Sequence, residues 1–393
     1  MSTAFELAAP TRILFGAGTA AQIPAIARAF GSRPLLVGGG SPARLAPLEA
    51  ALKRAGLTPA PNAVAVAGEP TVALVRDATA QARDAGCDVV IACGGGSALD
   101  AGKAIAALLG NGGDPLDYLE VVGSGRTLER PGLPFLAAPT TAGTGSEVTR
   151  NAVLASTEHR VKASLRSPLM LARAAIVDPD LLVGLPATVV ASSGLDALSQ
   201  LIEPFLSSRA NPVTDALARE GIARSARALR PAYHDTVGGR GANAAEREDL
   251  ALASLLGGLC LANAGLGAVH GFAAPVGGSW PAPHGAACAA LLPHVMRVNL
   301  RALETRASEH PARARFREIA VLLTGHADAV AADGIAWLDE LCAALAVPGL
   351  ARYGMTAADI PDLVEKARVA SSMKANPLPL TDAELTEIAE RAL

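Results

Sequence analysis

Pro139-Thr-Thr-Ala-Gly-Thr-Gly-Ser-Glu-Val-Thr149, taken with the earlier Gly94-Gly-Gly-Ser97, decides how the first half of this chain folds. Each of these loops follows a short apolar run with the composition of a strand, at 135–138 and 88–93. Glycines at the end of a strand let backbone amides approach an anion, and a helix that begins there adds the positive end of its dipole. The two loops therefore predict a cradle for the phosphates and ribose of a nucleotide.

Strand-like and helix-like segments alternate on both sides of these loops. Pro34-Leu-Leu-Val37 and Ala174-Ala-Ile-Val177 are further strand-like runs, 45–55 and 74–85 have helical spacing, and another helix begins near Ala98. This alternation is typical of a mainly parallel sheet with helices on both faces.

The composition changes after 178–186, a stretch rich in Pro, Asp and Leu. Helix-period segments dominate from there to the end of the chain, at 187–207, 212–233, 246–264, 285–300, 312–325, 331–346 and 379–392. We predict an α/β nucleotide-binding domain over 1–183 and an all-helical domain over 184–393, since 393 residues exceed the usual size of one domain.

Charge and composition exclude several classes of partner. A net charge of -3 gives no electrostatic reason to expect nucleic acid or an anionic membrane. The segment 251–269 is apolar but holds four glycines and leads into a Pro-rich loop, so we interpret it as a buried central helix rather than a membrane span. Five scattered cysteines without a C-x-x-C pair, and a start unlike a signal peptide, favour reduced thiols and a cytoplasmic location.

The glycine loops differ from the usual dinucleotide fingerprint, because neither reads G-x-G-x-x-G. Alone, the triple glycine is as compatible with a tight strand-to-helix turn as with a ligand site. The second loop adds hydroxyls that can donate to phosphate or ribose, those of Thr140, Thr141, Thr144 and Ser146. The prediction of a nucleotide cradle rests on this combination.

A third glycine run, Gly38-Gly-Gly-Ser41, follows the strand where the adenosine ribose is commonly recognised. A carboxylate there would accept from the ribose 2′-hydroxyl and repel a 2′-phosphate. This chain offers Gly39 and Ser41 instead, with Arg44 nearby, which slightly favours NADP over NAD. The alternative is that Arg44 is simply a solvated helix residue.

A candidate metal site comes from the second half. Asp196 and Gln200 are four residues apart and share a helix face, whereas His270 and His284 are fourteen apart. Prolines at 275, 281 and 283 argue against one continuous helix between the histidines, so a turn can bring both imidazoles to the Asp196 face. One carboxylate with two histidines suits a divalent transition metal and leaves positions open for a substrate oxygen. Taken singly, either histidine is better explained as a core residue beside an apolar helix, and we expect His294 and the cysteines to be structural.

These motifs, in this order, resemble those of the iron-containing (group III) alcohol dehydrogenases over nearly the whole chain. The resemblance rests on segments distributed from end to end, namely 12–18, 94–103, 139–149, 211–215, 267–271, 283–285, 291–296 and 373–377. It implies a dehydroquinate synthase-like architecture, with an α/β nucleotide domain, an all-helical domain and a cleft between them. It also implies a metal that polarises an alcohol or carbonyl oxygen while hydride passes to or from nicotinamide, and a homodimer.

The resemblance assigns roles by motif position. The residues that would hold the pyrophosphate and ribose are Gly95, Gly96, Ser97, Thr140, Thr141 and Ser146, with Asp100 on the nicotinamide side and Lys162 at a ribose. Lys162 is otherwise read as an exposed helix lysine. Asp196, His270 and His284 would be the metal ligands and catalytic residues.

Two positions depart from the family pattern. Gln200 stands where the family has a histidine that is normally a fourth ligand, and Ala274 stands where it has a histidine often assigned to proton relay. An amide oxygen is a weaker ligand than imidazole, so Gln200 is at best a weak fourth ligand. Glycerol dehydrogenases manage with one Asp and two His, so we still expect Fe²⁺ or Zn²⁺ here.

The leading interpretation is an NAD(P)-dependent alcohol dehydrogenase that acts as an aldehyde or ketone reductase on small molecules. The departures leave room for a metal-independent oxo-acid reductase resembling maleylacetate reductase. A lyase that recycles NAD, as dehydroquinate synthase does, and a catalytically idle binding protein are the remaining alternatives.

Overall fold

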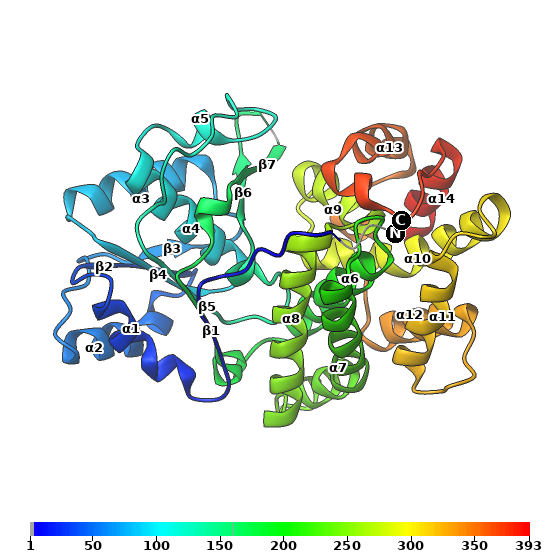
Figure 1. Cartoon of the computed structure of the whole chain (residues 1–393), viewed down its shortest axis with the longest axis horizontal. Coiled ribbons are helices and arrows are strands. Elements are labelled where there is room, and N and C mark those ends of the chain that lie inside the picture. The colour runs from blue at the N-terminus through cyan, green and yellow to red at the C-terminus, as the bar shows by residue number, and fades with distance from the viewer. Residues whose placement is uncertain (1–3, 160) are drawn as a thin grey trace. The chain divides into compact units, whose positions relative to one another are not determined.

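The computed structural model describes residues 4–159 and 161–393 (Figure 1). The chain forms two compact units. One comprises Ala8–Thr141 and Gly145–Leu182, and the other comprises Val183–Leu393 with residues 4–7 and Ala142–Thr144. The first is built on a parallel sheet and the second consists of helices, so the predicted fold class is confirmed.

A six-stranded parallel sheet with the order β1-β8-β5-β4-β2-β3 organises the first unit. Its strands are β1 (Ile13–Phe15), β2 (Pro34–Gly39), β3 (Val64–Val66), β4 (Val89–Gly94), β5 (Phe135–Pro139) and β8 (Ala174–Val177). The helices of this unit are α1 (Ile23–Arg28), α2 (Ala46–Arg54), α3 (Val72–Asp84), α4 (Gly96–Asn111) and α5 (Pro115–Tyr118).

Alternate residues of the central strands enter two different cores, which is why these strands are apolar throughout. In β2, Leu35 and Val37 join a core that includes Val75 of α3 and Leu99 of α4. Leu36 points to the other core, with residues of α1 and α2. The sheet is therefore covered on both faces, as the alternation of strands and helices predicts.

A topological switch point lies between β2 and β4. The chain passes from β2 outward to β3, then returns to the opposite side of β2 and continues through β4 and β5. In open α/β sheets ligands bind at the carboxyl ends of the strands beside such a point. The glycine runs that end β2 and β4 lie there.

A two-stranded antiparallel hairpin, β6 (Asn151–Ser156) with β7 (Val161–Arg166), is not among the elements expected from the sequence. Residues of β6 alternate between buried and half-buried, the pattern of a strand with one face on a core. Ala152 and Leu154 pack on the same core as α4. Lys162 lies on β7, so its interpretation as a helix lysine is wrong.

The second unit contains nine helices among the described residues. They are α6 (Ala187–Leu206), α7 (Pro212–Val237), α8 (Ala244–Ala264), α9 (Ala268–Ser279), α10 (His284–Arg306), α11 (Ala312–Thr324), α12 (Ala331–Ala344), α13 (Ile360–Val369) and α14 (Asp382–Ala392). Helices α9 and α13 are not among those expected from the sequence. Helix α9 was expected to be a loop because of its prolines, but Pro275 lies inside it.

The apolar stretch 251–269 is not one helix. Helix α8 ends at Ala264, and α9 begins at Ala268 with a bend of 99° between the two. Gly265 ends α8 with a φ of 72°, a conformation that favours glycine. Among the described residues no single helix is long and apolar enough to cross a membrane. The bent pair of α8 and α9 reaches that length and apolar composition only when the two helices are taken together.

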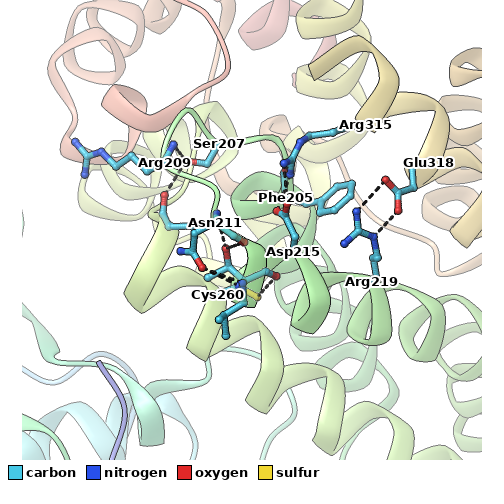
Figure 2. A network of polar contacts seen from close by, with 12 residues as sticks. Phe205, Ser207, Arg209, Asn211, Asp215, Arg219, Cys260, Arg315 and Glu318 are labelled. Atoms are coloured by element: carbon cyan, nitrogen blue, oxygen red, sulfur yellow. Dashed lines mark hydrogen bonds and ion pairs between the residues drawn. The ribbon is translucent and has the colours of Figure 1, made fainter. Parts of the chain in front are cut away.

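The motif Asn211-Pro-Val-Thr-Asp215 has a structural role, since its side chains cap one helix and join it to others (Figure 2). The Asn211 side chain accepts hydrogen bonds from the amides of Val213 and Thr214, both at 3.1 Å, and so caps α7. Asp215 accepts two hydrogen bonds from Arg315 of α11, at 2.6 and 2.7 Å. Arg315 also donates to the carbonyl of Phe205 and lies over its ring. The motif thus fixes the end of α6 against α7 and α11.

Candidate active site

Three helices of the second unit bring four possible metal ligands together. Asp196 lies in the middle of α6, His270 on the first turn of α9, and His284 and Cys288 on the first two turns of α10. One ligand atom from each residue lies within 4.8 Å of all the others. The three residues expected from the sequence therefore converge, and Cys288, which we expected to be a core residue, joins them.

The shortest distances within this cluster involve the ring nitrogens that point inward. His270 Nε2 lies 3.3 Å and His284 Nε2 3.7 Å from Asp196 Oδ1. The Cys288 sulfur is 3.7 Å from each of the same two nitrogens. These spacings are those of atoms arranged around a common centre.

Close packing of α10 on α6 holds His284 near Asp196. Gly285 follows His284, and a Cβ at that position would lie 2.5 Å from the backbone oxygen of Ser192 on α6. A larger residue would push the start of α10 away from α6. The glycine of the Pro-His-Gly motif is therefore required by the approach of the two helices.

The donor set fits a cation. Asp196 is 1% exposed, and its Oδ1 has no hydrogen-bond partner in the part of the chain that the structure describes. Within the same described ranges, the buried Oε1 of Gln200 has none either. Burying an unpaired polar oxygen costs about 1–3 kcal/mol, and more when it is charged. A divalent ion bound by Asp196, His270, His284 and Cys288 would remove the larger of these costs.

The charges around the histidines shift their pKa values in the direction expected of an anionic site. The neighbouring Cys288 sulfur, and after it the Asp196 carboxylate, raise the pKa of His284 to about 9 against the opposing effect of burial. Burial lowers the pKa of His270, but Cys288, Glu203 and Asp196 outweigh it and the pKa is raised well above its ordinary value. The cluster therefore attracts positive charge, carried by protons or by a metal.

Glu203 of α6 orients His270 from the side opposite the cluster. Its Oε2 lies 2.5 Å from His270 Nδ1, and its Oε1 accepts a hydrogen bond from the amide of Val269 at 2.6 Å. A carboxylate there keeps the proton on Nδ1 and leaves Nε2 as the ligand atom. A Cβ on Gly267 would lie 3.0 Å from Oε1, so a residue without a side chain makes room for this carboxylate.

We expect Glu203→Gln to lower metal affinity by about 10- to 100-fold, because the amide NH₂ cannot accept the Nδ1 proton that the carboxylate accepts. Titration of the chelated protein with a divalent ion measures the effect. Glu318→Gln, which breaks an ion pair with Arg219 elsewhere in the second unit, is the control and should leave the affinity unchanged. Equal affinities for wild type and Glu203→Gln would contradict the orienting role.

Asn376 fixes the start of α9 from the far end of the chain. Its Oδ1 accepts from the amide of Ala268 at 3.2 Å, and its side chain exchanges hydrogen bonds with Asn299 of α10. This explains the 373–377 motif, to which the sequence analysis gave no role. Ala274 lies on the same helix, one turn beyond His270, and is exposed.

Three turns at the carboxyl edge of the sheet form the candidate nucleotide cradle in the first unit. β4 lies between β2 and β5, and in that register Gly94 is opposite Pro139. The amide of Thr140 donates to the carbonyl of Gly94 at 2.9 Å. A Cβ on Gly94 would lie 3.1 Å from the amide nitrogen of Gly39. Gly39, Gly94 and Thr140 are therefore neighbours, although up to 101 residues separate them in sequence.

Helix α4 begins at this edge with backbone donors. Gly95 is the N-cap and has no side chain to accept from the first amides, and Gly96 and Ser97 form the first turn. Helix N-termini of this kind bind anions through their amides and dipole. The Thr141 side chain lies within 3.5 Å of the position that a Cβ on Gly95 would take. The Thr141 hydroxyl and the amides at the start of α4 are therefore close together.

Asp100 and Ser146, both expected to contact the cofactor, are joined to each other. Ser146 Oγ donates to Asp100 Oδ1 at 2.5 Å, and the other carboxylate oxygen accepts from the amide of Val153 at 2.9 Å. Lys103, 1% exposed, donates to the carbonyls of Ser146 and Asn151 at 2.8 and 2.7 Å. This network shapes the loop from Ser146 to the hairpin.

Burial raises the pKa of Glu147, beside this network, from 4.5 to about 7. Since the folded pKa is the higher one, the folded state gains stability from the bound proton below about pH 4.5 and loses it as the pH rises through 7. We expect Glu147→Gln to remove a fall of about 3 kcal/mol in the free energy of unfolding between these pH values. Urea unfolding at pH 5 and pH 8 measures it, and Glu129→Gln, at an exposed site, should retain the wild-type pH dependence. The same fall in Glu147→Gln would contradict the shift.

Two predicted cofactor residues lie outside these turns. Lys162 of β7 forms an ion pair with Glu69 at 2.9 Å. Ser41 is exposed and precedes a short 3₁₀ helix, Pro42–Leu45, on which Arg44 is also exposed.

Comparison with known proteins agrees with these observations. The family model described as iron-containing alcohol dehydrogenase matches residues 10–179, and the model for the C-terminal part of that family matches 190–393. A 1,3-propanediol dehydrogenase from Klebsiella pneumoniae is 39% identical over 324 residues, which are 81% of this chain and 79% of that protein.

Solved structures share the fold over the full length. The structure of a 1,3-propanediol oxidoreductase has a TM-score of 0.89 and 34% identity, and it covers 99% of this chain and 100% of its own. A sulfoacetaldehyde reductase from Bifidobacterium kashiwanohense, in complex with NAD⁺, has a TM-score of 0.83 and 27% identity over 100% and 99% of the two chains. This chain is an oxidoreductase that acts on CH–OH groups, and it belongs to the iron-containing alcohol dehydrogenase family.

Proposed function

We propose that this protein is an NAD(P)-dependent alcohol dehydrogenase that reduces small aldehydes or ketones at a divalent metal held by Asp196, His270 and His284. The observation that carries the proposal is the buried Asp196 oxygen that lacks a hydrogen-bond partner among the described residues and faces two imidazole nitrogens. When bound, the ion acts as a Lewis acid on the substrate oxygen.

Residues of the chain bind the cofactor and orient the metal ligands. The amides at the start of α4 and the hydroxyls of Thr140 and Thr141 bind the pyrophosphate and ribose of the cofactor. Glu203 holds the proton on His270 Nδ1 and so fixes the direction in which Nε2 points. Reduction takes a hydride from NAD(P)H and a proton from solvent, since Ala274 supplies no acid at the position where a relay histidine is expected.

The substrate class follows from the relatives by analogy. The chain is similar to 1,3-propanediol dehydrogenases and, at 43% identity over 231 residues, to a long-chain-alcohol dehydrogenase from Geobacillus thermodenitrificans. We therefore propose primary alcohols and diols, and the corresponding aldehydes, as the class to assay. The glycine-rich end of β2, without a carboxylate to repel a 2′-phosphate, supports use of NADP with a slight preference over NAD.

The test combines metal analysis with oxidation of NADPH and NADH on a panel of aldehydes, ketones and oxo acids. Activity that disappears on chelation and returns with Fe²⁺ or Zn²⁺ supports the proposal. Activity on oxo acids that chelation leaves unchanged would favour a metal-independent reductase, the alternative to which Gln200 and Ala274 point. Turnover without net change in NAD(P)H absorbance would identify a lyase instead.

A further inference from the structure

We infer that Cys288 is a thiolate ligand of this metal, in place of the imidazole that Gln200 does not provide, and that the site therefore prefers a borderline-soft ion such as Zn²⁺. The inference rests on the proposed metal site and adds to it the identity of the fourth ligand and the class of ion.

The geometry of Cys288 is that of a ligand. It lies one turn after His284 on α10, so its side chain shares a helix face with that histidine. Tetrahedral zinc, with bonds of about 2.0 Å to nitrogen or oxygen and about 2.3 Å to sulfur, places O and N ligand atoms about 3.3 Å apart and S and N about 3.5 Å apart. The corresponding distances here are 3.3 and 3.7 Å from Asp196 Oδ1 to the imidazoles and 3.7 Å from Cys288 Sγ to each of them.

Gln200 has a different place in the cluster. It lies one turn after Asp196 on the same face of α6, and its amide, after the two histidines, lowers the pKa of that carboxyl against the effect of burial. A polar neighbour of this kind orients a ligand without binding the ion itself. The amide oxygen is also a weaker ligand than a thiolate for these ions. Gln200 is then a positioning residue, and Cys288 is the candidate for the fourth ligand.

The other cysteines do not share this environment. Cys260 is equally buried, but its sulfur donates to the carbonyl of Thr214 in the core of the second unit. Cys342 lies against the carbonyl of Ala289. Only Cys288, among the described cysteines, lies with two imidazoles and a carboxylate.

A thiolate ligand changes the net charge of the site and the ions that it prefers. Asp196 and Cys288 together carry two negative charges, which neutralise a divalent ion, whereas one carboxylate with three imidazoles leaves a net positive charge. Thiolate ligands favour zinc over harder ions. Binding would release the thiol proton, and the ion would supply Lewis-acid chemistry to a substrate oxygen.

The test uses Co²⁺ as a spectroscopic probe on the full-length protein after chelation. We expect the wild type to bind Co²⁺ with a near-ultraviolet thiolate-to-cobalt charge-transfer band. Cys288→Ser should lose that band and bind Zn²⁺ on the order of 100-fold more weakly, because even residues that only support a ligand contribute 10- to 100-fold. Cys260→Ser is the matched control and should keep both the band and the affinity.

The outcomes separate this inference from the proposed function. Co²⁺ binding without a charge-transfer band in the wild type, or an unchanged band in Cys288→Ser, would overturn the thiolate ligand and leave a site of nitrogen and oxygen ligands. Failure of the wild type to bind Co²⁺ or Zn²⁺ at all would overturn the metal site and the proposed mechanism with it. If Cys288→Ser does not fold, Cys288→Asn, with an amide of similar size, gives the same readout.

Discussion

His270→Ala is expected to reduce carbonyl reduction by about 10³-fold or more, while NADPH binding stays within a few-fold of wild type. The imidazole belongs to a candidate metal ligand, 3.7 Å from the Cys288 sulfur and 3.3 Å from the Asp196 oxygen that has no hydrogen-bond partner among the described residues. A bound metal contributes several kcal/mol to stabilising the developing charge, and each 1.4 kcal/mol is about a factor of ten in rate. Steady-state kinetics and fluorescence titration with NADPH measure the two effects.

A second histidine of α10 provides the matched control. His294 is half-buried and contacts Arg297, away from the metal cluster. His294→Ala should keep both the metal content and the rate. If His270→Ala weakened NADPH binding as much as it slowed turnover, the division between a metal site in one unit and a nucleotide cradle in the other would be wrong.

Periodicity was sufficient to predict the architecture, because its signal is local. The strands β2, β4 and β5 are short apolar runs that end in glycine or proline, β8 is a short apolar run before Asp178, and α7, α8 and α14 of the second unit have side-chain caps. Helix α9 escaped notice because Pro275 normally argues against a helix interior. The hairpin of β6 and β7 was not predicted, because the alternation of apolar and polar residues over six positions is a weak signal when one strand includes Lys162 and Ser164.

The candidate metal site was predictable only in part, because some of its residues carry no local sequence signal. Asp196, His270 and His284 are residue types that bind metals, so their presence in one domain suggested a site. Cys288 was set aside because we sought paired cysteines, although its place four residues after His284 puts both on one helix face. Glu203 likewise follows Asp196 by seven residues on one face of α6. Asn376 carries no local signal, since its contact with Ala268 spans 108 residues.

Lys103→Met is expected to have the opposite effect to His270→Ala: NADPH binding at least tenfold weaker, with metal content unchanged. The ammonium donates to two carbonyls and to the hydroxyls of Ser146 and Thr149, between 2.7 and 3.1 Å. Asp100 lies 3.7 Å away. Methionine fills similar space but leaves these acceptors without their donor and the buried Asp100 carboxylate without its neighbouring positive charge, which costs about 3–5 kcal/mol of unfolding free energy.

The loss of cofactor binding follows because these acceptors belong to the loop after β5. Without Lys103, the segment from Ser146 to Asn151 loses its bonds to the ammonium and keeps those of Ser146 and Val153 to Asp100, so the hydroxyls of that loop are held less firmly to α4. Lys103→Arg retains the charge but cannot place one ammonium among four acceptors, so it should fold and still bind NADPH more weakly. Lys366→Met, at an exposed ion pair with Asp362, should change neither stability nor binding. Wild-type NADPH affinity in a folded Lys103→Met would show that the loop holds its shape without the buried lysine, and would leave the amides of α4 as the principal cofactor contacts.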